Sequence, residues 1–400
     1  MGCMMRVLCL IDCLGSGGAQ RQLTFLARQL KKLNIDVEVL TYYADNFFQQ
    51  VLSEAGIDIE TIRYTDRYTR AVTLRKSIRA KRFDVLLAFM DGPSLYAEIA
   101  ALPYRRWGLV VSERSAIPGS TTGFGRLRRL MHCLADYVTT NSHTNRLMIE
   151  KAVPRLTNKV VTIYNSLDLS YFSPLEHPYH SEDGRLRFVV LASHQFLKNL
   201  LGLVEAAQRV LKAIPELNFV IEWYGGFAVG ENGRVDMRPL EEARQRIELY
   251  RIQDYFIFHK PTSDVVGLYR QGDAIILPSF FEGLPNVVCE AMACGRPVLM
   301  SNVCDAENLV HDGENGFLFD PQNPDDMCRA MLRFLTLSPE ERYLLGRKSR
   351  ERAELLFNSD RFVAHYQHVL ESAMRREHKI IPHWYSDTPQ SATKTIESER

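Results

Sequence analysis

The sequence predicts an α/β protein with two doubly wound parallel sheets, one in each half of the chain. Short apolar runs with strand character alternate with longer runs of helical periodicity, and the alternation occurs in two successive sets. A polar stretch at residues 171–184 separates the two sets. The length of 400 residues is enough for two domains of ordinary size.

The first half contains six runs with strand character. They lie at residues 6–11, 36–41, 58–62, 84–89, 108–111 and 160–163. The clearest helix between them is expected over residues 19–32, because Leu23, Leu26, Ala27 and Leu30 lie on one face at helical spacing.

The second half repeats this pattern. Strands are predicted at residues 187–191, 218–221, 255–258, 274–277 and 297–300, and helices at 200–214, 240–250 and 265–270. After Phe319 the chain is expected to be helical to about residue 375. The tail at residues 377–400 is polar and is expected to be disordered.

The composition is that of a soluble globular protein, with 46% hydrophobic and 24% charged residues. No apolar run approaches the length of about 20 residues that spans a bilayer. The eight cysteines form no C-x-x-C pair, and no histidine pair has the spacing of a zinc site. We therefore expect a reducing cytoplasmic compartment, no metal and no other cofactor.

The charge is distributed unevenly along the chain. Residues 1–170 hold 23 basic and 15 acidic residues, whereas the whole chain has a net charge of only +1. The basic residues gather at 63–82 and at 126–129. This distribution favours an anionic acceptor or an anionic membrane surface as a partner of the first half, unless these residues form an ordinary solvated helix face. No nucleic-acid partner is expected.

The most informative motif contains Glu282 and Glu290, with seven residues between them. The apolar run 274–277 leads into the motif, and a helix is predicted from Asn286 onward. Eight helical residues rise about 12 Å. The free N–H groups of a helix start attract anions. Two carboxylates that flank such a start suit a ligand with two hydroxyl-rich ends and an anionic middle, such as a nucleotide sugar.

The segment from Pro278 to Val298 resembles the retaining glycosyltransferases of the GT-B fold, in particular family 4. In that family the segment reads P-S-x-x-E-G-x-P-x-x-x-x-E-A-M-A-x-G-x-P-V, and every fixed position is filled here. The resemblance covers roughly residues 6–375. It implies two Rossmann-like domains and the transfer of a sugar, with retention, from a UDP- or GDP-sugar to a hydroxyl group. The acceptor would be a glycan or a polyprenyl-linked molecule, in cell-surface polysaccharide or glycoconjugate biosynthesis.

The resemblance also implies a domain organisation. Residues 1–170 would form the acceptor domain, 171–184 a linker and 185–358 the nucleotide-sugar donor domain. Residues 359–376 would form a helix that packs back toward the first domain. No D-x-D metal motif is present, so transfer without a metal is expected. The enzyme would act in the cytoplasm, with peripheral membrane contact through the basic first domain.

A glycine-rich turn follows the first predicted strand and contains Gly17 and Gly18. Such a turn lets backbone N–H groups approach a phosphate. A nicotinamide site is the rival interpretation, but G-x-G-x-x-G fails at Gln20, and the second strand ends in Tyr42 and Tyr43 without an acidic residue. The resemblance implies that Gly17 and Gly18 face the donor diphosphate.

In the second half, the resemblance assigns the departing diphosphate to Lys198 and to the segment Gly283, Leu284, Pro285, Asn286 and Val287. Glu282 would contact the hydroxyls of the donor sugar and Glu290 the ribose. Ser193 occupies a position where the family often has arginine, and His194 or Lys260 is a candidate substitute. Gly225 is expected to allow close backbone approach to the cleft, and Lys260 lies in the turn near the nucleobase.

Ser112-Glu113-Arg114 follows a predicted strand in the first half. The resemblance implies that Glu113 orients an acceptor hydroxyl and that Arg114 meets an acceptor phosphate. The alternative is an internal ion pair between these two residues that holds the loop.

Two other classes of protein remain open. One is a nucleotide-sugar 2-epimerase of the same fold, against which the spacing of Glu282 and Glu290 argues. The other is a non-catalytic nucleotide-sugar binder, which Ser193 favours.

Overall fold

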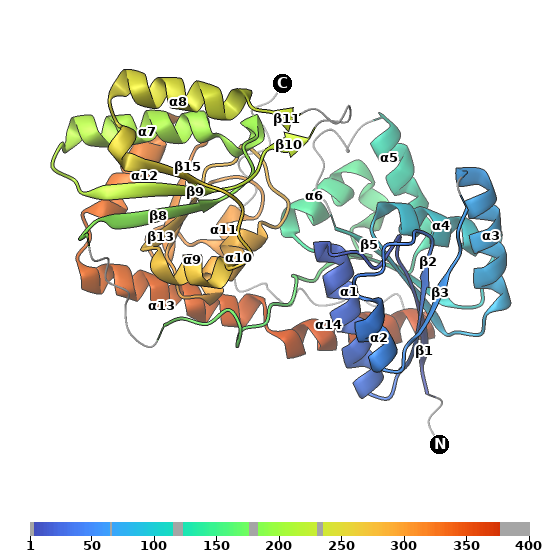
Figure 1. Ribbon diagram of the computed structural model, residues 1–400. Coiled ribbons are helices and arrows are strands. Elements are labelled where there is room, and N and C mark those ends of the chain that lie inside the picture. Colours follow the sequence, from blue (N-terminus) through green and yellow to red (C-terminus); the bar gives the residue numbers. More distant parts are fainter. Residues whose placement is uncertain (1–3, 65, 115–122, 176–182, 230–234, 377–400) are drawn as a thin grey trace. The chain divides into compact units, whose positions relative to one another are not determined.

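The computed structural model describes residues 4–64, 66–114, 123–175, 183–229 and 235–376 (Figure 1). The chain divides into two compact units. Unit 1 contains the residues up to Ser166 and those from Ser359 onward, and unit 2 contains Leu167–Asn358.

Unit 1 is built on a parallel sheet of seven strands in the order β3-β2-β1-β4-β5-β6-β7. The strands are β1 (Arg6–Leu10), β2 (Asp36–Thr41), β3 (Asp58–Thr61), β4 (Val85–Phe89), β5 (Gly108–Glu113), β6 (Tyr137–Thr140) and β7 (Val160–Thr162). The six predicted strands are confirmed. The sequence analysis missed β6, whose four residues Tyr-Val-Thr-Thr follow a short 3-10 turn and show no alternation.

The sheet of unit 1 is buried on both faces, as βα crossovers require. Along β1, Val7 and Cys9 enter one core, while Leu8 and Leu10 enter the other. The first core is covered by α1 (Gly18–Lys32), α2 (Gln49–Glu54) and α14 (Ser359–Arg375). The second core is covered by α3 (Arg67–Ala80), α4 (Asp91–Ala101) and α6 (His143–Ala152). The short helix α5 (Gly123–Leu130) precedes the 3-10 turn η1 (Met131–Leu134).

Helix α14 belongs to unit 1 although it lies at the far end of the sequence. It contacts α1, β4 and β5. Its backbone comes so close to the sheet that a Cβ atom on Gly108 would lie 2.4 Å from the Ala373 carbonyl oxygen. Gly108 is therefore required for this helix to pack on β5.

Unit 2 is built on a parallel sheet of six strands in the order β12-β9-β8-β13-β14-β15. The strands are β8 (Leu186–Leu191), β9 (Phe219–Tyr224), β12 (Phe256–His259), β13 (Ala274–Leu277), β14 (Val298–Ser301) and β15 (Gly316–Phe319). A separate antiparallel ribbon pairs β10 (Ala228–Val229) with β11 (Val235–Asp236) and was not predicted. Both sheets have the doubly wound topology that the sequence predicts.

Helices cover both faces of the second sheet (Figure 1). Helices α7 (Leu200–Ala213), α8 (Arg238–Tyr250) and α12 (Pro324–Leu335) form the main core with it. Helices α9 (Val265–Gln271), α10 (Asn286–Ala293) and α13 (Pro339–Leu356) lie on the other face, where α10 contacts β13, β14 and α13. The remaining elements are α11 (Ala306–Leu309) and the 3-10 turns η2 (Pro154–Leu156), η3 (Phe196–Lys198) and η4 (Gln253–Tyr255).

The segment that follows Ser166 is attached to unit 2 by one side chain of α13. The Arg350 guanidinium donates to the carbonyl oxygens of Leu169, Phe172 and Ala293 at 3.1, 2.7 and 2.6 Å. The compact units therefore divide at Ser166, four residues before the domain end that we expect from the sequence at residue 170.

Four charged side chains form a buried network that joins α4, β5, α5 and η1 in unit 1. Glu98, His132, Arg129 and Glu113 are each at most 4% exposed. His132 lies 2.5 Å from Glu98 through Nδ1 and 3.3 Å from Glu113 through Nε2, and Arg129 pairs with Glu113. Burial opposes the charged imidazole, but the hydrogen bonds of Glu113 and Glu98 outweigh it and raise the pKa of His132 to about 9.

We expect the free energy of unfolding to decrease as the pH rises from 6.5, the ordinary pKa of histidine, through about 9. Because the pKa of His132 is raised in the folded state, its stabilising contribution is complete below pH 6.5 and is lost as the folded imidazole deprotonates. Denaturant unfolding of the wild type and of His132→Gln across this window measures the effect. The variant should be about 3–5 kcal/mol less stable at neutral pH, since Glu98 loses its ion-pair partner and Glu113 keeps Arg129 but loses the imidazolium. The difference between the two proteins should shrink toward high pH.

The matched control is His311→Gln, whose ring is 35% exposed beside Glu314. It should keep the pH dependence of the wild type. A difference between wild type and His132→Gln that stays constant from pH 6 to pH 10 would show that His132 is neutral in the fold.

Candidate active site

The candidate site of unit 2 lies where the strand order of its sheet reverses, between β8 and β13. In such sheets the loops at the carboxyl ends of the two central strands turn to opposite faces and leave a crevice for a ligand. The loop after β8 carries Lys198, and the loop after β13 carries Glu282. The Phe280 N–H donates to the Leu197 carbonyl at 2.9 Å and ties these two loops together.

Lys198 and Glu282 form an ion pair in this crevice. The Lys198 Nζ lies 2.6 Å from Glu282 Oε1, and the side chains are 21% and 15% exposed. The sequence places both residues in the donor site, and the structure brings them into direct contact across 84 positions of the chain.

The position of Lys198 is set by the residue that follows it. Asn199 has a left-handed backbone with φ of 53° and caps α7, because its side chain accepts from the Gly202 N–H. Its amide also donates to the Pro321 carbonyl at 2.9 Å. Lys198 therefore stands on a turn that is fixed at two points, and its ammonium is the part that can move.

Glu282 is supported by a residue that the sequence analysis did not single out. Its backbone N–H donates to Cys304 Sγ at 3.4 Å, and Cys304 is itself left-handed with φ of 55°. Burial raises the pKa of this thiol to about 11, so the sulfur is a neutral packing group. No motif in the sequence points to this contact, because Cys304 belongs to a different loop.

Helix α10 begins directly after this loop. Pro285 is its N-cap residue; no described side chain caps it, and its first turn contains no acidic residue. Gly283 and Leu284 precede the cap, and Asn286 and Val287 open the helix. The first N–H groups of a helix lack intrahelical partners and carry partial positive charge. This end of α10 therefore favours an anion.

Glu290 lies further along α10 and is half-buried. The Tyr269 hydroxyl of α9 donates to Glu290 Oε2 at 2.8 Å, and Tyr269 is fully buried. Burial and the adjacent carboxylate raise the pKa of Tyr269, so its phenol remains a donor. Tyr269 thus fixes the orientation of Glu290, a role that the sequence analysis missed because the two residues belong to different helices.

His194 does not occupy the open position that the sequence analysis gives it. It is 2% exposed, and its ring lies among those of Trp223, Phe227 and Phe258 at 5.9, 5.3 and 6.0 Å. Burial lowers its pKa, and neither ring nitrogen has a hydrogen-bond partner among the described residues. A neutral, enclosed imidazole cannot replace the arginine that Ser193 displaces, so this expectation is corrected.

The other candidate residues of unit 2 are Gly225, Ser193 and Lys260. A Cβ atom on Gly225 would lie 1.8 Å from the Ala192 carbonyl oxygen, so the approach of two strand ends explains this glycine without a ligand. Ser193 is half-buried at the end of β8, and Lys260 is exposed after β12. Beside Lys260, His259 stacks on Tyr224 with ring centroids 4.2 Å apart. Lys260 is the cation that remains as a substitute for the missing arginine.

In unit 1 the glycine turn lies at the carboxyl end of β1, where the order of that sheet also reverses. Gly17 is the N-cap of α1, Gly18 is its first residue, and both are exposed. Gly17 has an ordinary φ of −70°, but a Cβ there would lie 2.3 Å from Oε1 of Gln20, which is buried and donates to Asp12 Oδ1 at 3.0 Å. The buried Gln20 amide therefore accounts for glycine at position 17 without a ligand.

Glu113 and Arg114 lie in contacts internal to unit 1. Both carboxylate oxygens of Glu113 accept hydrogen bonds from Arg129 and His132. Glu113 therefore forms an internal ion pair, as one interpretation of the sequence predicts, but its partner is Arg129 and not Arg114. Arg114 donates to the Tyr366 hydroxyl at 3.1 Å and to Asn165, and lies over the Phe89 ring. In this arrangement Glu113 is a buried structural carboxylate and has no oxygen available for an acceptor hydroxyl.

The basic cluster at 63–82 is also partly structural. Arg70 donates to the Tyr43 hydroxyl, and Arg75 donates to the Ile99 carbonyl. Arg79 donates to the carbonyls of Ala100, Leu102 and Tyr104. Lys81 forms ion pairs with Glu38 and Glu60. The arginine contacts satisfy the carboxyl end of α4. Arg63, Arg67, Lys76 and Arg82 remain exposed.

The described residues contain neither a metal-binding cluster nor a membrane-spanning helix. No cluster of three or more His, Cys, Asp or Glu side chains there could hold a metal ion. No helix in the same ranges has the length and hydropathy needed to cross a bilayer.

Comparison with known proteins identifies both halves of the chain. Residues 16–171 match the family described as "Glycosyltransferase Family 4", and residues 185–336 match "Glycosyl transferases group 1". The chain is 25% identical over 328 residues to the GalNAc-alpha-(1->4)-GalNAc-alpha-(1->3)-diNAcBac-PP-undecaprenol alpha-1,4-N-acetyl-D-galactosaminyltransferase of Campylobacter jejuni, covering 79% of this chain and 84% of that protein. It is also 25% identical over 354 residues to an uncharacterized glycosyltransferase of Haemophilus influenzae, covering 85% and 92%.

Solved structures show the same fold. Anabaena Alr3699/HepE in complex with UDP superposes with a TM-score of 0.75 at 18% identity, covering 92% of this chain and all of that one. A glycosyltransferase from Rickettsia africae gives a TM-score of 0.75 at 15% identity, covering 93% and 99%. With both halves matched in order and two doubly wound sheets in the structure, this chain belongs to the family 4, group 1 glycosyltransferases of the GT-B fold.

Proposed function

We propose that this protein transfers a hexose, with retention and without a metal, from a UDP- or GDP-sugar to a hydroxyl of a glycan or polyprenyl-linked acceptor. The observation that carries the proposal is the Lys198–Glu282 ion pair beside the start of α10, whose first turn contains no acidic residue. The Campylobacter relative is named for an undecaprenol-linked substrate, and the Anabaena structure contains UDP. Both names support a nucleotide-sugar donor and a lipid-linked acceptor, as in cell-surface glycan biosynthesis.

Lys198 has the main electrostatic role in this mechanism. Negative charge accumulates on the diphosphate as the bond to the sugar breaks, and a fixed cation stabilises that charge most strongly in the transition state. Without donor, the ammonium is neutralised by Glu282 at 2.6 Å. Donor binding would transfer the ammonium to the diphosphate and release the Glu282 carboxylate to the sugar hydroxyls.

The other end of the donor would be held by α10. The N–H groups of Leu284, Asn286 and Val287 would face the diphosphate. Glu290 would accept the ribose hydroxyls in the orientation that Tyr269 imposes. The proposed reaction needs no second catalytic carboxylate pair of the kind that glycosidases use.

Two rival functions make different predictions in one assay. A screen of UDP- and GDP-sugars for nucleotide release, with and without a glycan acceptor, should show acceptor-dependent release for a transferase. A 2-epimerase would release or isomerise its donor without acceptor. A non-catalytic binder, which Ser193 in the place of arginine favours, would bind the nucleotide and release nothing.

Lys198→Ala should lower kcat at least a hundredfold with a smaller rise in KM, because the lost interaction is strongest in the transition state. Steady-state kinetics with the donor identified by the screen measure this. Lys260→Ala is the comparison variant, since Lys260 is the exposed cation that could substitute for the missing arginine, and its loss in kcat should be smaller than that of Lys198→Ala. If Lys260→Ala carries the larger loss in kcat, Lys260 and not Lys198 stabilises the leaving group.

Glu290→Gln should weaken binding of the nucleoside diphosphate about tenfold or more, because charge-assisted hydrogen bonds are worth about 1.5–3 kcal/mol each. Tyr269→Phe should weaken it less, since the carboxylate remains but loses one orienting contact. Isothermal titration calorimetry with UDP and GDP, together with thermal unfolding to verify the fold, tests both. Unchanged affinity in Glu290→Gln would remove Glu290 from the ribose site.

We also propose reversible contact of unit 1 with an anionic membrane on its cytoplasmic side. The residues proposed for this contact are the exposed Arg63, Arg67, Lys76 and Arg82, because Arg75 and Arg79 of the same cluster donate to carbonyl oxygens at the end of α4. Each basic residue near an anionic bilayer contributes about 1 kcal/mol.

Replacing these four residues together by Gln should release the protein from anionic vesicles in low-salt co-sedimentation and leave its nucleotide affinity unchanged. Arg75→Gln is the control, because Arg75 donates to the Ile99 carbonyl at 2.7 Å and should affect stability more than sedimentation. Equal sedimentation with anionic and neutral vesicles would reject electrostatic docking.

A further inference from the structure

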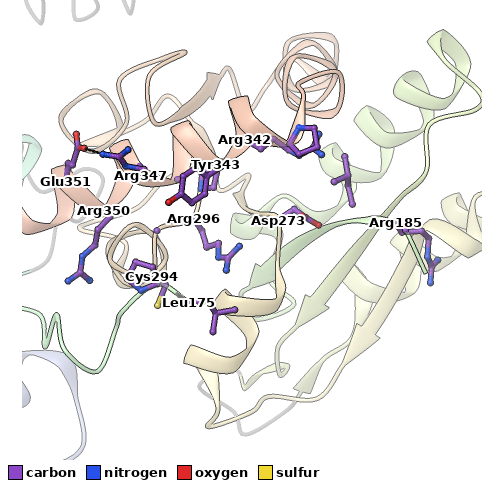
Figure 2. A pocket seen from close by; sticks show the side chains of 17 residues that line it. Leu175, Arg185, Asp273, Cys294, Arg296, Arg342, Tyr343, Arg347, Arg350 and Glu351 are labelled. Carbon is purple, nitrogen blue, oxygen red and sulfur yellow. Dashed lines mark ion pairs between the residues drawn. The ribbon is translucent and has the colours of Figure 1, made fainter. Parts of the chain in front are cut away.

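Unit 2 contains a second cavity with a volume of about 480 Å³, at the end of the sheet opposite to the candidate active site. Its walls come from the segments that precede β8, β13 and β14, from the end of α10 and from the first turns of α13 (Figure 2). Figure 2 shows Arg296 near its centre, with Tyr343 on one side, Leu175 on the other and Asp273 beside it. Lys198 and Glu282 lie at the carboxyl ends of β8 and β13, so this cavity is not part of the donor site.

The cavity is lined by five arginines and two carboxylates. Three of the arginines form ion pairs with adjacent carboxylates: Arg185 with Asp183 at 2.8 Å, Arg347 with Glu351 at 3.6 Å and Arg350 with Glu354 at 2.6 Å, and Asp183 and Glu351 are shared with Arg187 and Lys348. The remaining two are Arg296 and Arg342, and Asp273 is the carboxylate left to balance them.

Neither Arg296 nor Arg342 forms an ion pair within the described part of the chain. Arg296 donates to the Arg270 carbonyl at 2.8 Å, and its buried Nε has no acceptor there. Arg342 donates to the Leu337 carbonyl. Burial lowers the pKa of Arg296, and burial raises the pKa of Asp273, whose Oδ2 already accepts from the Arg187 N–H at 2.7 Å. Among the described residues, two half-buried guanidinium groups thus face one carboxylate, and the buried Nε of Arg296 lacks an acceptor, an arrangement that an anion would complete.

The helix that ends at the cavity does not cancel this positive charge. The carboxyl end of α10 would oppose an anion if its carbonyl groups faced the cavity. They are occupied instead: Ala293 accepts from Arg350 at 2.6 Å, and Glu290, Ala291 and Met292 accept from the backbone N–H groups of residues 294–296.

We propose that this cavity binds the phosphoryl group of a small phosphate monoester, such as a hexose phosphate, between Arg296 and Arg342. Planar guanidinium groups match the oxygens of a phosphate with parallel hydrogen bonds. The exposed Tyr343 hydroxyl offers a further polar contact at the rim. The volume lies in the range of pockets that hold small organic ligands and exceeds what one phosphate ion fills.

Isothermal titration calorimetry with glucose 6-phosphate and with inorganic phosphate tests the site on the full chain. Arg296→Gln and Arg342→Gln should each weaken binding of both probes about tenfold, because each removes a charge-assisted contact. Arg347→Gln is the matched control: it lies on the same wall, is paired with Glu351, and should change affinity less than twofold. Lys198→Ala should retain the affinity of the wild type, which separates this site from the donor site and keeps the result independent of the proposed function.

Tighter binding of glucose 6-phosphate than of inorganic phosphate would establish that the ester is the ligand, and equal binding would establish a site for the phosphoryl group alone. Thermal unfolding identifies a variant that fails to fold, and Arg342→Gln, on the half-buried side of the cavity, then carries the test. No binding to the wild type at millimolar probe, affinity unchanged in both arginine variants, or affinity lost in Lys198→Ala would overturn the proposal.

Discussion

The candidate site of unit 2 depends on a topological constraint of its parallel sheet. Its winding reverses between β8 and β13, so the connections that leave these two strands go to opposite faces and cannot fill the space between them. Lys198 and Glu282 come from those two connections, and their ion pair lies at the reversal. The start of α10 is delivered to the same edge because this helix follows β13 directly. The position of the Lys198–Glu282 ion pair and that of the start of α10 thus both result from the reversal of strand order between β8 and β13.

Two buried or half-buried sets of charges show how similar residues serve different purposes. In unit 1, Glu113 and His132 are at most 4% exposed, and each charged group of their network pairs with a group of opposite charge. Exchange with a ligand would cost the full desolvation of those partners, so the network stabilises the fold. The Lys198–Glu282 pair keeps 21% and 15% of its side chains exposed and consists of one flexible cation and one carboxylate. Such a pair can open at low cost, which suits a ligand that offers a stronger anion.

The sequence could predict those features that depend on neighbours in the chain. The two doubly wound parallel sheets and the helix after Pro285 follow from local periodicity, and the choice of Glu282 and Glu290 follows from a motif within 21 residues. The failures concern contacts between distant segments. Tyr269 supports Glu290, and Cys304 supports Glu282, each from a different element. Arg129 pairs with Glu113 from a helix that was not predicted from the sequence. His194 follows a strand like a site residue, but three aromatic rings from separate positions enclose it.

Arginine use explains why net charge is a poor guide to partners in this protein. Residues 1–170 have an excess of basic residues, yet Arg75 and Arg79 donate to the carbonyls that α4 leaves open at its end. Arg350 binds a linker segment to α13 in the same way. A guanidinium group that donates to several carbonyl oxygens retains its charge but loses much of its freedom to meet an external anion. Among the described residues, Arg296 and Arg342 each donate to one carbonyl oxygen and form no ion pair, so further N–H groups are left for an anion. The partners of each arginine, and not the density of basic residues along the sequence, therefore decide which positive charges a ligand can meet.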